Sequence, residues 1–301
     1  MIIEPNRRRR TRIFRAFAGA VAIVMVGAMV ASGLTLPAIS LAPAATSTAG
    51  PTPTAATAVA SEPAGPTSVV PSPTPTAAPA PTPDSHGCFP PPAGTVPADV
   101  VSHGSRTEKK VALTFDDGTN PENAHRIFGI LYGARVNATF FPTGRSVQLF
   151  PDLWKDVASA GYPIANHTYS HQSLKGLCYQ LQLAELLHDK RVVEGLDLAL
   201  MPVMRPPYEE FDLGTRFAAS AAGESHVVLW DVDTMDWTGL SVSAIVSRAV
   251  AGRSGSIVLM HTSPANTANA LRTIIGRYRA RGFTFVTIGQ MFGIEGAVPF
   301  P

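Results

Sequence analysis

The sequence predicts an α/β protein whose folded part is a (β/α) barrel of about seven parallel strands. From about Cys88 onward, short apolar segments typical of strands alternate with longer segments typical of helices. Such alternation favours parallel pairing through right-handed crossovers, in a barrel or an open sheet. Polar and ionisable residues follow five of the expected strands, and this favours the barrel, because the strand ends of a barrel gather on one face.

Composition divides the chain into three segments. Residues 1–42 form a basic leader with an apolar helix, residues 43–87 a disordered linker, and residues 88–301 the folded domain. The linker is rich in Pro, Ala, Thr and Ser, and 11 of its first 42 residues are proline. Such a composition cannot bury a core, so we expect an extended tether.

The leader predicts export. No charged residue occurs from Ala16 to Leu36, a run long enough to cross a bilayer and also compatible with a long signal-peptide core. Proline within the small-residue cleavage site at 42–44 slightly favours a retained anchor. We therefore expect an extracytoplasmic envelope protein, membrane-anchored or secreted, whose N-terminus is held in the cytoplasm by arginines at positions 7, 8, 9, 10, 12 and 15.

Charge excludes nucleic acid as a partner. Residues 85–301 contain 18 Lys and Arg and 19 Asp and Glu, so the basic excess of the whole chain lies in the leader. The exported part contains two cysteines, Cys88 and Cys178, in a compartment where disulfides persist. We expect these two cysteines to form a disulfide, and two free thiols are the alternative. We also expect the protein to be a monomer.

The elements of the domain follow from apolar runs and their stop signals. Pro121 suits a first helical turn, and Gly161, Gly252 and Gly282 suit helix ends. The expected helices are 121–132, 147–160, 179–196, 213–222, 242–251 and 266–280. The expected strands are 109–115, 135–141, 162–165, 203–205, 226–232, 255–260 and 283–288.

One group of polar residues has the composition of a metal site. His167 and His171 have the i, i+4 spacing that places two imidazoles on one side of a helical turn. Asp117, at the exit of the first strand, would add a carboxylate oxygen and leave positions for water and substrate. Zinc fits this set best, and cobalt, nickel and iron accept the same ligand types.

Five short blocks lie at the ends of five of the expected strands: TFDDG (114–118), HTYSH (167–171), RPPY (205–208), DTMDW (233–237) and LMH (259–261). In this order they resemble the polysaccharide deacetylase family, also called the NodB homology domain or carbohydrate esterase family 4. The resemblance covers about residues 109–292 and implies a distorted barrel of about seven strands. It also implies that Asp117, His167 and His171 bind one divalent metal.

The same resemblance implies the remaining roles. Asp116 would be the general base, oriented by Arg205, and His261 the general acid, steered by Asp236. The backbone N–H of Tyr208 would face the oxyanion. Two apolar residues would complete the substrate pocket: Trp237 as its wall and Leu259 as the contact for the acetyl methyl group.

The expected function is metal-dependent hydrolysis of N-acetyl groups on an amino-sugar polymer. Peptidoglycan is the first choice, because an anchored domain on a tether would face the cell wall, and chitin-like polymers are also open. The rivals are O-deacetylation of a polysaccharide such as xylan, and a surface glycan-binding protein without turnover. Thr119, Glu209, Glu210 and Thr262 depart from the family pattern, from which we expect altered specificity or rate.

Overall fold

The structure is a computed structural model that describes Thr82 and residues 88–294. The expected leader, 1–42, and all of the expected linker apart from Thr82 lie outside these residues. Among the residues described, no helix has both the length and the hydropathy needed to span a membrane. The apolar run 16–36 lies outside the described residues, so its role as an anchor or signal segment stays a prediction.

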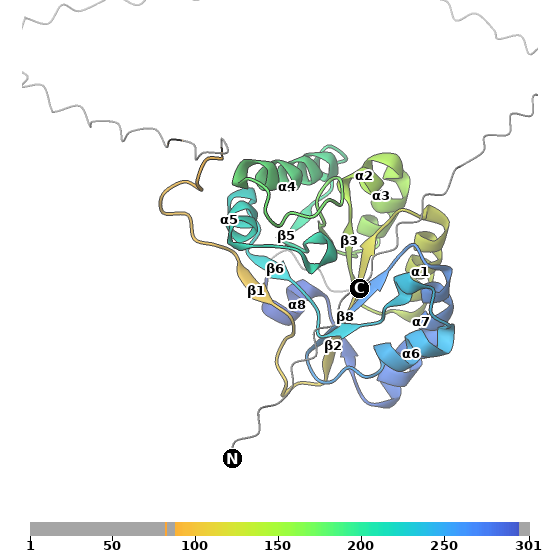
Figure 1. Ribbon diagram of the computed structural model, residues 1–301. Helices are drawn as coiled ribbons and strands as arrows, with labels where there is room; N and C mark the ends of the chain where they lie inside the picture. The colour runs from red at the N-terminus through yellow and green to blue at the C-terminus, as the bar shows by residue number, and fades with distance from the viewer. Residues whose placement is uncertain (1–81, 83–87, 295–301) are drawn as a thin grey trace, which may run out of the picture. The chain divides into compact units, whose positions relative to one another are not determined.

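A single sheet of parallel strand pairs forms the centre of the described domain, with helices around it (Figure 1). The strand order is β1-β6-β5-β4-β3-β2-β8-β7, and β9 also pairs with β2. The strands are β1 (Asp99–Val101), β2 (Lys110–Asp117), β3 (Thr139–Pro142), β4 (Ile164–Asn166), β5 (Leu200–Met204), β6 (His226–Val228), β7 (Val232–Asp233), β8 (Ser256–His261) and β9 (Thr284–Phe285).

The helices follow the expected segments closely. Side-chain caps begin several of them; Asn120 accepts from the Asn123 N–H, and Asp212 forms a capping box with Thr215. The helices are α1 (Pro121–Ala134), α2 (Gly144–Leu149), α3 (Pro151–Ser159), α4 (Tyr179–Glu194), α5 (Leu213–Ala222), α6 (Val242–Ala249), α7 (Ala265–Ala280) and α8 (Ile288–Phe292), with short 3-10 turns η1 (Pro207–Glu209) and η2 (Asp236–Thr238).

The sheet curls into a distorted barrel, as predicted. β6 and β7 are consecutive in sequence, yet β6 pairs with β5 and β7 pairs with β8 at the other end of the order. The expected continuous strand 226–232 is therefore wrong, because it is interrupted after Val228. In the interruption, Asp231 accepts from the backbone N–H of Ile257 (2.9 Å) and pairs with Arg106 (2.8 Å).

Two other expected elements differ for local reasons. The expected helix 147–160 is two helices, because Pro151 has no N–H to continue α2 and instead starts α3. The expected strand 283–288 is shorter, because Thr287 caps α8 by accepting from the Gln290 N–H. Strand β1 and helix α8 were not predicted; both are short.

Aromatic side chains fill the core between β2, β3 and the helices α1 and α3. Phe115 and Phe140 stack with ring centroids 5.4 Å apart, and Trp154 meets Phe140 edge-on at 6.0 Å. All three are fully buried. This packing fixes the strand β2, whose last two residues are the aspartates of the first block.

The disulfide Cys88–Cys178 is present, as predicted, and joins residues 90 positions apart. Cys178 is the residue that precedes α4. The bridge therefore ties the start of the folded domain to the helix that covers β4 and β5, and it limits the freedom of the unfolded chain.

Two buried carboxyl groups lie near the end of β4. Asp189 on α4 and Glu224 after α5 are almost completely buried. Within the described domain, neither oxygen of Asp189 and only one oxygen of Glu224 has a hydrogen-bond partner; Glu224 Oε1 accepts from Asn166 Nδ2 at 3.3 Å. Burial raises the pKa of Asp189 well above its ordinary value and the pKa of Glu224 to about 8. A lone buried carboxylate is costly, so these groups favour the protonated form.

Replacing Glu224 by glutamine should remove a pH dependence of stability. Between the ordinary pKa of 4.5 and about 8 the folded protein retains this proton and the unfolded chain releases it, so stability falls as pH rises through that window. The unfolding free energy of Glu224→Gln minus that of the unmodified protein should therefore increase by up to about 4 kcal/mol from acidic to alkaline pH.

Urea unfolding at about pH 5 and about pH 8.5 measures this gain. Glu122→Gln is the control, because Glu122 is exposed on α1 and is not among the charges that shift the pKa of Glu224. Equal pH dependence in Glu224→Gln and the unmodified protein would contradict the assignment.

Candidate active site

Three side chains from two segments of the chain meet at the carboxyl end of the strands. Asp117 ends β2, whereas His167 and His171 belong to the loop after β4. Asp117 Oδ1 lies 3.6 Å from His167 Nε2 and 3.3 Å from His171 Nε2. The ligand atoms of the three residues all lie within 4.8 Å of one another. One ion could therefore contact all three.

The two imidazoles are held with Nε2 directed to this point. His167 Nδ1–H donates to the carbonyl oxygen of Arg205 at 2.8 Å, which leaves the Nε2 lone pair free. His171 Nδ1 is hydrogen-bonded to the Tyr208 hydroxyl at 3.1 Å. Bonds of this kind from the second nitrogen are the usual way in which proteins orient metal-binding histidines. The Tyr208 hydroxyl contact was not anticipated from the sequence.

The histidine pair does not lie on a helical turn, and that expectation is wrong. Thr168 and His171 have left-handed backbone, with φ of 62° and 63°. The loop is fixed instead by side chains: Asn166 Oδ1 accepts from the Thr168 N–H at 3.0 Å, and Thr168 Oγ1 accepts from the His171 N–H at 3.1 Å. The i, i+4 spacing therefore brings the rings together through a compact loop.

Asp117 has the properties of a metal ligand. Its Oδ1 is buried and, among the described residues, has no hydrogen-bond partner. Burial alone raises the pKa of Asp117, but hydrogen bonding and charge from the imidazoles of His167 and His171, when these carry a proton on Nε2, lower it well below the ordinary value. A buried anion facing two imidazole lone pairs is an arrangement that a divalent cation satisfies.

Asp116 lies beside this cluster and has a different partner. Its Oδ1 accepts from Arg205 Nη1 at 2.6 Å, and its Oδ2 lies 3.9 Å from His167 Nε2. Arg205 is fully buried, and burial lowers its pKa while Asp116 raises it. The guanidinium also donates to Thr114 Oγ1 and to the carbonyl oxygen of Val228. One carboxylate oxygen of Asp116 is thus left facing the cluster.

A second carboxylate holds a histidine on the opposite side. Strand β8 places His261 in register with Asp116 of β2. His261 Nδ1 is bonded to Asp236 Oδ1 at 2.7 Å, and Asp236 Oδ2 accepts from the His261 N–H and from Thr267 Oγ1. Burial lowers the pKa of His261, but Asp236 outweighs it and raises the pKa to about 9. The imidazole is therefore cationic at neutral pH.

Thr262 has a structural role that the sequence did not reveal. It is fully buried; its hydroxyl accepts from the Gly118 N–H at 2.8 Å and donates to the carbonyl oxygen of Asp116 at 3.1 Å. These bonds span Asp117, whose φ is 77°. Thr262 thus holds the strained turn that presents the carboxylate of Asp117.

The remaining predicted residues differ in exposure. Trp237 and Tyr208 are 60% and 65% exposed, whereas Leu259 is buried. Tyr208 and Glu209 both have positive φ, near 60°. The acidic pair Glu209 and Glu210 is exposed beside Tyr208.

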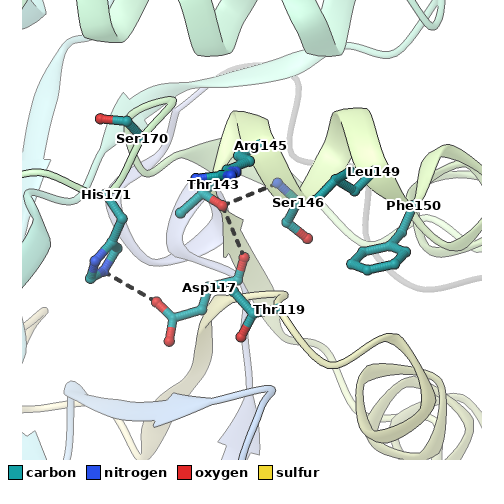
Figure 2. Close-up of a pocket in the computed structure, with 9 residues that line it drawn as sticks. All are labelled: Asp117, Thr119, Thr143, Arg145, Ser146, Leu149, Phe150, Ser170 and His171. Carbon is teal, nitrogen blue, oxygen red and sulfur yellow. Dashed lines mark hydrogen bonds and ion pairs between the residues drawn. The ribbon is translucent and has the colours of Figure 1, made fainter. Parts of the chain in front are cut away.

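A pocket of about 340 Å³ adjoins the cluster (Figure 2). Asp117 and His171 lie on one side of it and Leu149 and Phe150 on the other. This pocket was not predicted, because one of its walls comes from α2, a segment without a recognised motif. The complete lining is Asp117, Thr119, Thr143, Arg145, Ser146, Leu149, Phe150, Ser170 and His171.

Comparison with known proteins gives a consistent result. A family model described as polysaccharide deacetylase matches residues 103–227. A peptidoglycan-N-acetylglucosamine deacetylase of Bacillus cereus is 32% identical over 215 residues, which are 69% of this chain and 78% of that protein. The chain belongs to the polysaccharide deacetylase family. Against PgdA of Listeria monocytogenes, a deacetylase of the same name, identity is 31% over 63% of this chain but only 40% of the relative.

Solved structures from the polysaccharide deacetylase family share this fold. The Bc1960 peptidoglycan N-acetylglucosamine deacetylase superposes with a TM-score of 0.63 at 30% identity, covering 66% of this chain and 95% of that one. A structure described as a family 4 pseudoenzyme, BA3943 of Bacillus anthracis, gives 0.62 at 27% identity and covers 65% and 69%. The fold alone therefore does not distinguish a hydrolase from an inactive relative.

Replacing Asp117 or His167 by alanine should abolish metal binding without unfolding the domain. Each change removes one of three ligands, and we expect Zn²⁺ affinity to fall by at least about 100-fold. Titration calorimetry with Zn²⁺ measures the effect, and Asp156→Ala is the control, because Asp156 is exposed on α3 outside the cluster. Unchanged affinity in either ligand variant would refute the ligand set.

Proposed function

We propose that this protein is a metal-dependent hydrolase that removes N-acetyl groups from an amino-sugar polymer, with peptidoglycan as its first substrate. The observation that carries the proposal is the arrangement around the Asp117, His167 and His171 cluster. Asp116 Oδ2, which has no bond to Arg205, lies 3.9 Å from His167 Nε2 of this cluster. The protonated imidazole of His261 comes from the neighbouring strand β8, where His261 is in register with Asp116. Amide hydrolysis needs a base and an acid in such positions.

The cluster would hold one divalent ion through Asp117, His167 and His171, and Zn²⁺ suits these ligands best. When bound, such an ion supplies Lewis-acid activation of water and of the acetyl carbonyl. Cobalt, nickel and iron satisfy the same nitrogen and oxygen donors, so the metal itself is a matter for measurement.

Asp116 is the proposed general base. Its Oδ2 would accept a proton from the attacking water, while Arg205 holds Oδ1 and favours the ionised carboxylate. Because Arg205 is buried and bonded on three sides, the carboxylate has little freedom to turn. The base is thus fixed before substrate arrives, which reduces the reorganisation required during the reaction.

His261 is the proposed general acid. Its Nδ1 is bonded to Asp236, so Nε2 is the atom that would donate a proton to the departing amine. Asp236 keeps the imidazole protonated by raising its pKa. The leaving nitrogen needs this proton, because an amide anion does not leave unaided.

The remaining roles concern substrate contacts. The Tyr208 N–H would donate to the oxyanion, a contribution of about 3–4 kcal/mol for one well-directed donor. The exposed ring of Trp237 suits packing against a sugar, and buried Leu259 suits contact with the acetyl methyl group. The exposed Glu209 and Glu210 next to Tyr208 would influence which polymers enter.

The proposed setting is the cell envelope. The disulfide Cys88–Cys178 is compatible with the oxidising conditions outside the cytoplasm, where disulfides persist. We propose that residues 1–42 anchor the chain in the membrane or direct its secretion, and that residues 43–87 are the tether by which the catalytic domain, 88–301, reaches its polymer as a monomer. Deacetylase relatives named for peptidoglycan support that choice of polymer.

Two alternatives remain to be tested by experiment. The same groups could hydrolyse an acetate ester on a polysaccharide such as xylan, because an ester is a better electrophile than an amide. A glycan-binding protein without turnover is the other alternative, for which the pseudoenzyme BA3943 is a precedent in the family. The complete set of Asp116, Asp117, both cluster histidines and His261 argues against a pure binder.

Acetate release from peptidoglycan, chitin oligomers and acetylated xylan tests the proposed function. We expect acetate from the first two and the fastest release from peptidoglycan. Release from xylan alone would favour ester hydrolysis. No acetate from any polymer, with Zn²⁺ bound, would favour the binding protein.

Replacing Asp116 by asparagine should keep the metal and lose turnover. The amide cannot accept the proton from water, so kcat should fall by about 100- to 10,000-fold. Zn²⁺ stoichiometry and circular dichroism verify that the site and the fold survive, since the buried Arg205 loses its ionic partner. A kcat within tenfold of the unmodified protein would remove Asp116 as the base.

Replacing Asp236 by asparagine should move the alkaline limb of the pH–rate profile to lower pH. The imidazolium of His261 is the active form, and loss of the Asp236 charge lowers its pKa, so we expect a shift of about one unit or more. A bound cation lowers the apparent pKa of the alkaline limb in both the unmodified protein and Asp236→Asn. The quantity to measure is therefore the difference in apparent pKa between the two proteins. Thr267→Val is the control, because it keeps the charge of Asp236, and it should shift the apparent pKa of the alkaline limb less. The same apparent pKa in the unmodified protein, Asp236→Asn and Thr267→Val would contradict the assignment.

A further inference from the structure

The pocket beside the metal cluster has polar groups that are already engaged within the protein. Ser146 Oγ donates to the carbonyl oxygen of Gly118 at 2.7 Å and accepts from Trp154 Nε1 at 3.1 Å. Thr143 Oγ1 accepts from the Ser146 N–H at 3.2 Å. These two hydroxyls therefore serve the structure of the pocket floor.

The polar groups on the pocket edge are engaged in the same way. The Ser170 hydroxyl and N–H both donate to Glu185 Oε2 at 2.9 Å, so that this carboxylate is turned to the loop. Thr119 Oγ1 is hydrogen-bonded to Ser263 Oγ at 2.6 Å. The other ionisable lining residues, Asp117 and His171, belong to the metal cluster.

Arg145 is the exception among the lining residues. Its backbone is fixed, because its N–H donates to the carbonyl oxygen of Tyr169 at 3.1 Å. Its side chain is exposed, and between residues 88 and 294 no ion pair or hydrogen bond engages the guanidinium. A guanidinium offers five donors in a planar arrangement that matches a carboxylate.

The opposite wall of the pocket is apolar. Leu149, on the same short helix as Arg145, is 62% exposed, and Phe150 follows it. Figure 2 shows Leu149 and Phe150 on the side of the pocket away from Asp117 and His171. An exposed apolar surface of this kind suits the C–H face or methyl group of a ligand. The pocket thus combines one free cation with an apolar wall.

We propose that this pocket binds a carboxylate-bearing sugar next to the acetamido sugar at the metal cluster, with Arg145 as the specificity-determining residue. The inference rests on the proposed function. In peptidoglycan such a unit is the muramic-type sugar, whose lactyl ether carries a carboxylate and a methyl group once its stem peptide has been removed. The protein therefore prefers anionic glycan strands to neutral oligomers of N-acetylglucosamine.

Binding to two polymers tests this preference. The full chain, loaded with Zn²⁺, is titrated with peptide-free peptidoglycan strands and with N-acetylglucosamine oligomers of similar length. In Arg145→Gln the affinity for the anionic strand should fall about tenfold more than the affinity for the neutral oligomer. Arg145→Lys should retain part of the preference, and added salt should weaken the anionic complex more.

Arg272→Gln is the matched control, because Arg272 is an exposed arginine on α7 and its loss changes the net charge equally. It should leave both affinities unchanged. Equal losses for both polymers in Arg145→Gln, or no loss for either, would overturn the inference. Acetate release is measured separately. If the protein binds the anionic strand preferentially but releases no acetate, the result contradicts the proposed function and leaves the role of Arg145 intact.

Discussion

The buried ion pair between Arg205 and Asp116 is the interaction on which the site depends. The guanidinium has no exposure and contacts three strands: it donates to Asp116 and Thr114 of β2 and to Val228 of β6, and it lies 4.2 Å from the ring of Phe141 in β3. Removing either charge would leave the other uncompensated in the interior, at a cost of about 3–5 kcal/mol. The pair therefore links β2 and β6 across the curled sheet and fixes the position of the proposed base.

The backbone of Arg205 extends this coupling to the metal cluster. Its carbonyl oxygen accepts from His167, so one residue orients both a proposed metal ligand and the proposed base. Around it the chain turns through left-handed conformations at Asp117, His171 and Tyr208, which are costly for these residues. Such strain persists only where surrounding contacts fix the backbone, as the Thr262 hydroxyl does on both sides of Asp117.

The sequence was sufficient for the order of elements because local signals dominate there. Apolar runs marked the strands, and prolines and glycines marked the helix ends. It was insufficient where tertiary partners replace local ones. The strand expected at 226–232 breaks because Asp231 binds Ile257 and Arg106, which lie far away in sequence. The cost of burying Asp189 and Glu224 was likewise invisible, because neither belongs to a motif.

The sequence by itself determined which chemical groups the site would contain, since the five blocks place ionisable residues where strands end. The family resemblance of the first block also predicted different tasks for the adjacent aspartates, Asp116 and Asp117. Only the tertiary structure decided how the groups meet: a loop in place of a helical turn for the histidines, and a tyrosine hydroxyl against His171. It alone placed Arg145 at a pocket beside the cluster. The physical reason is that neighbours distant in sequence decide which donor, acceptor and ligand atoms of a side chain remain available. No local sequence pattern records these neighbours.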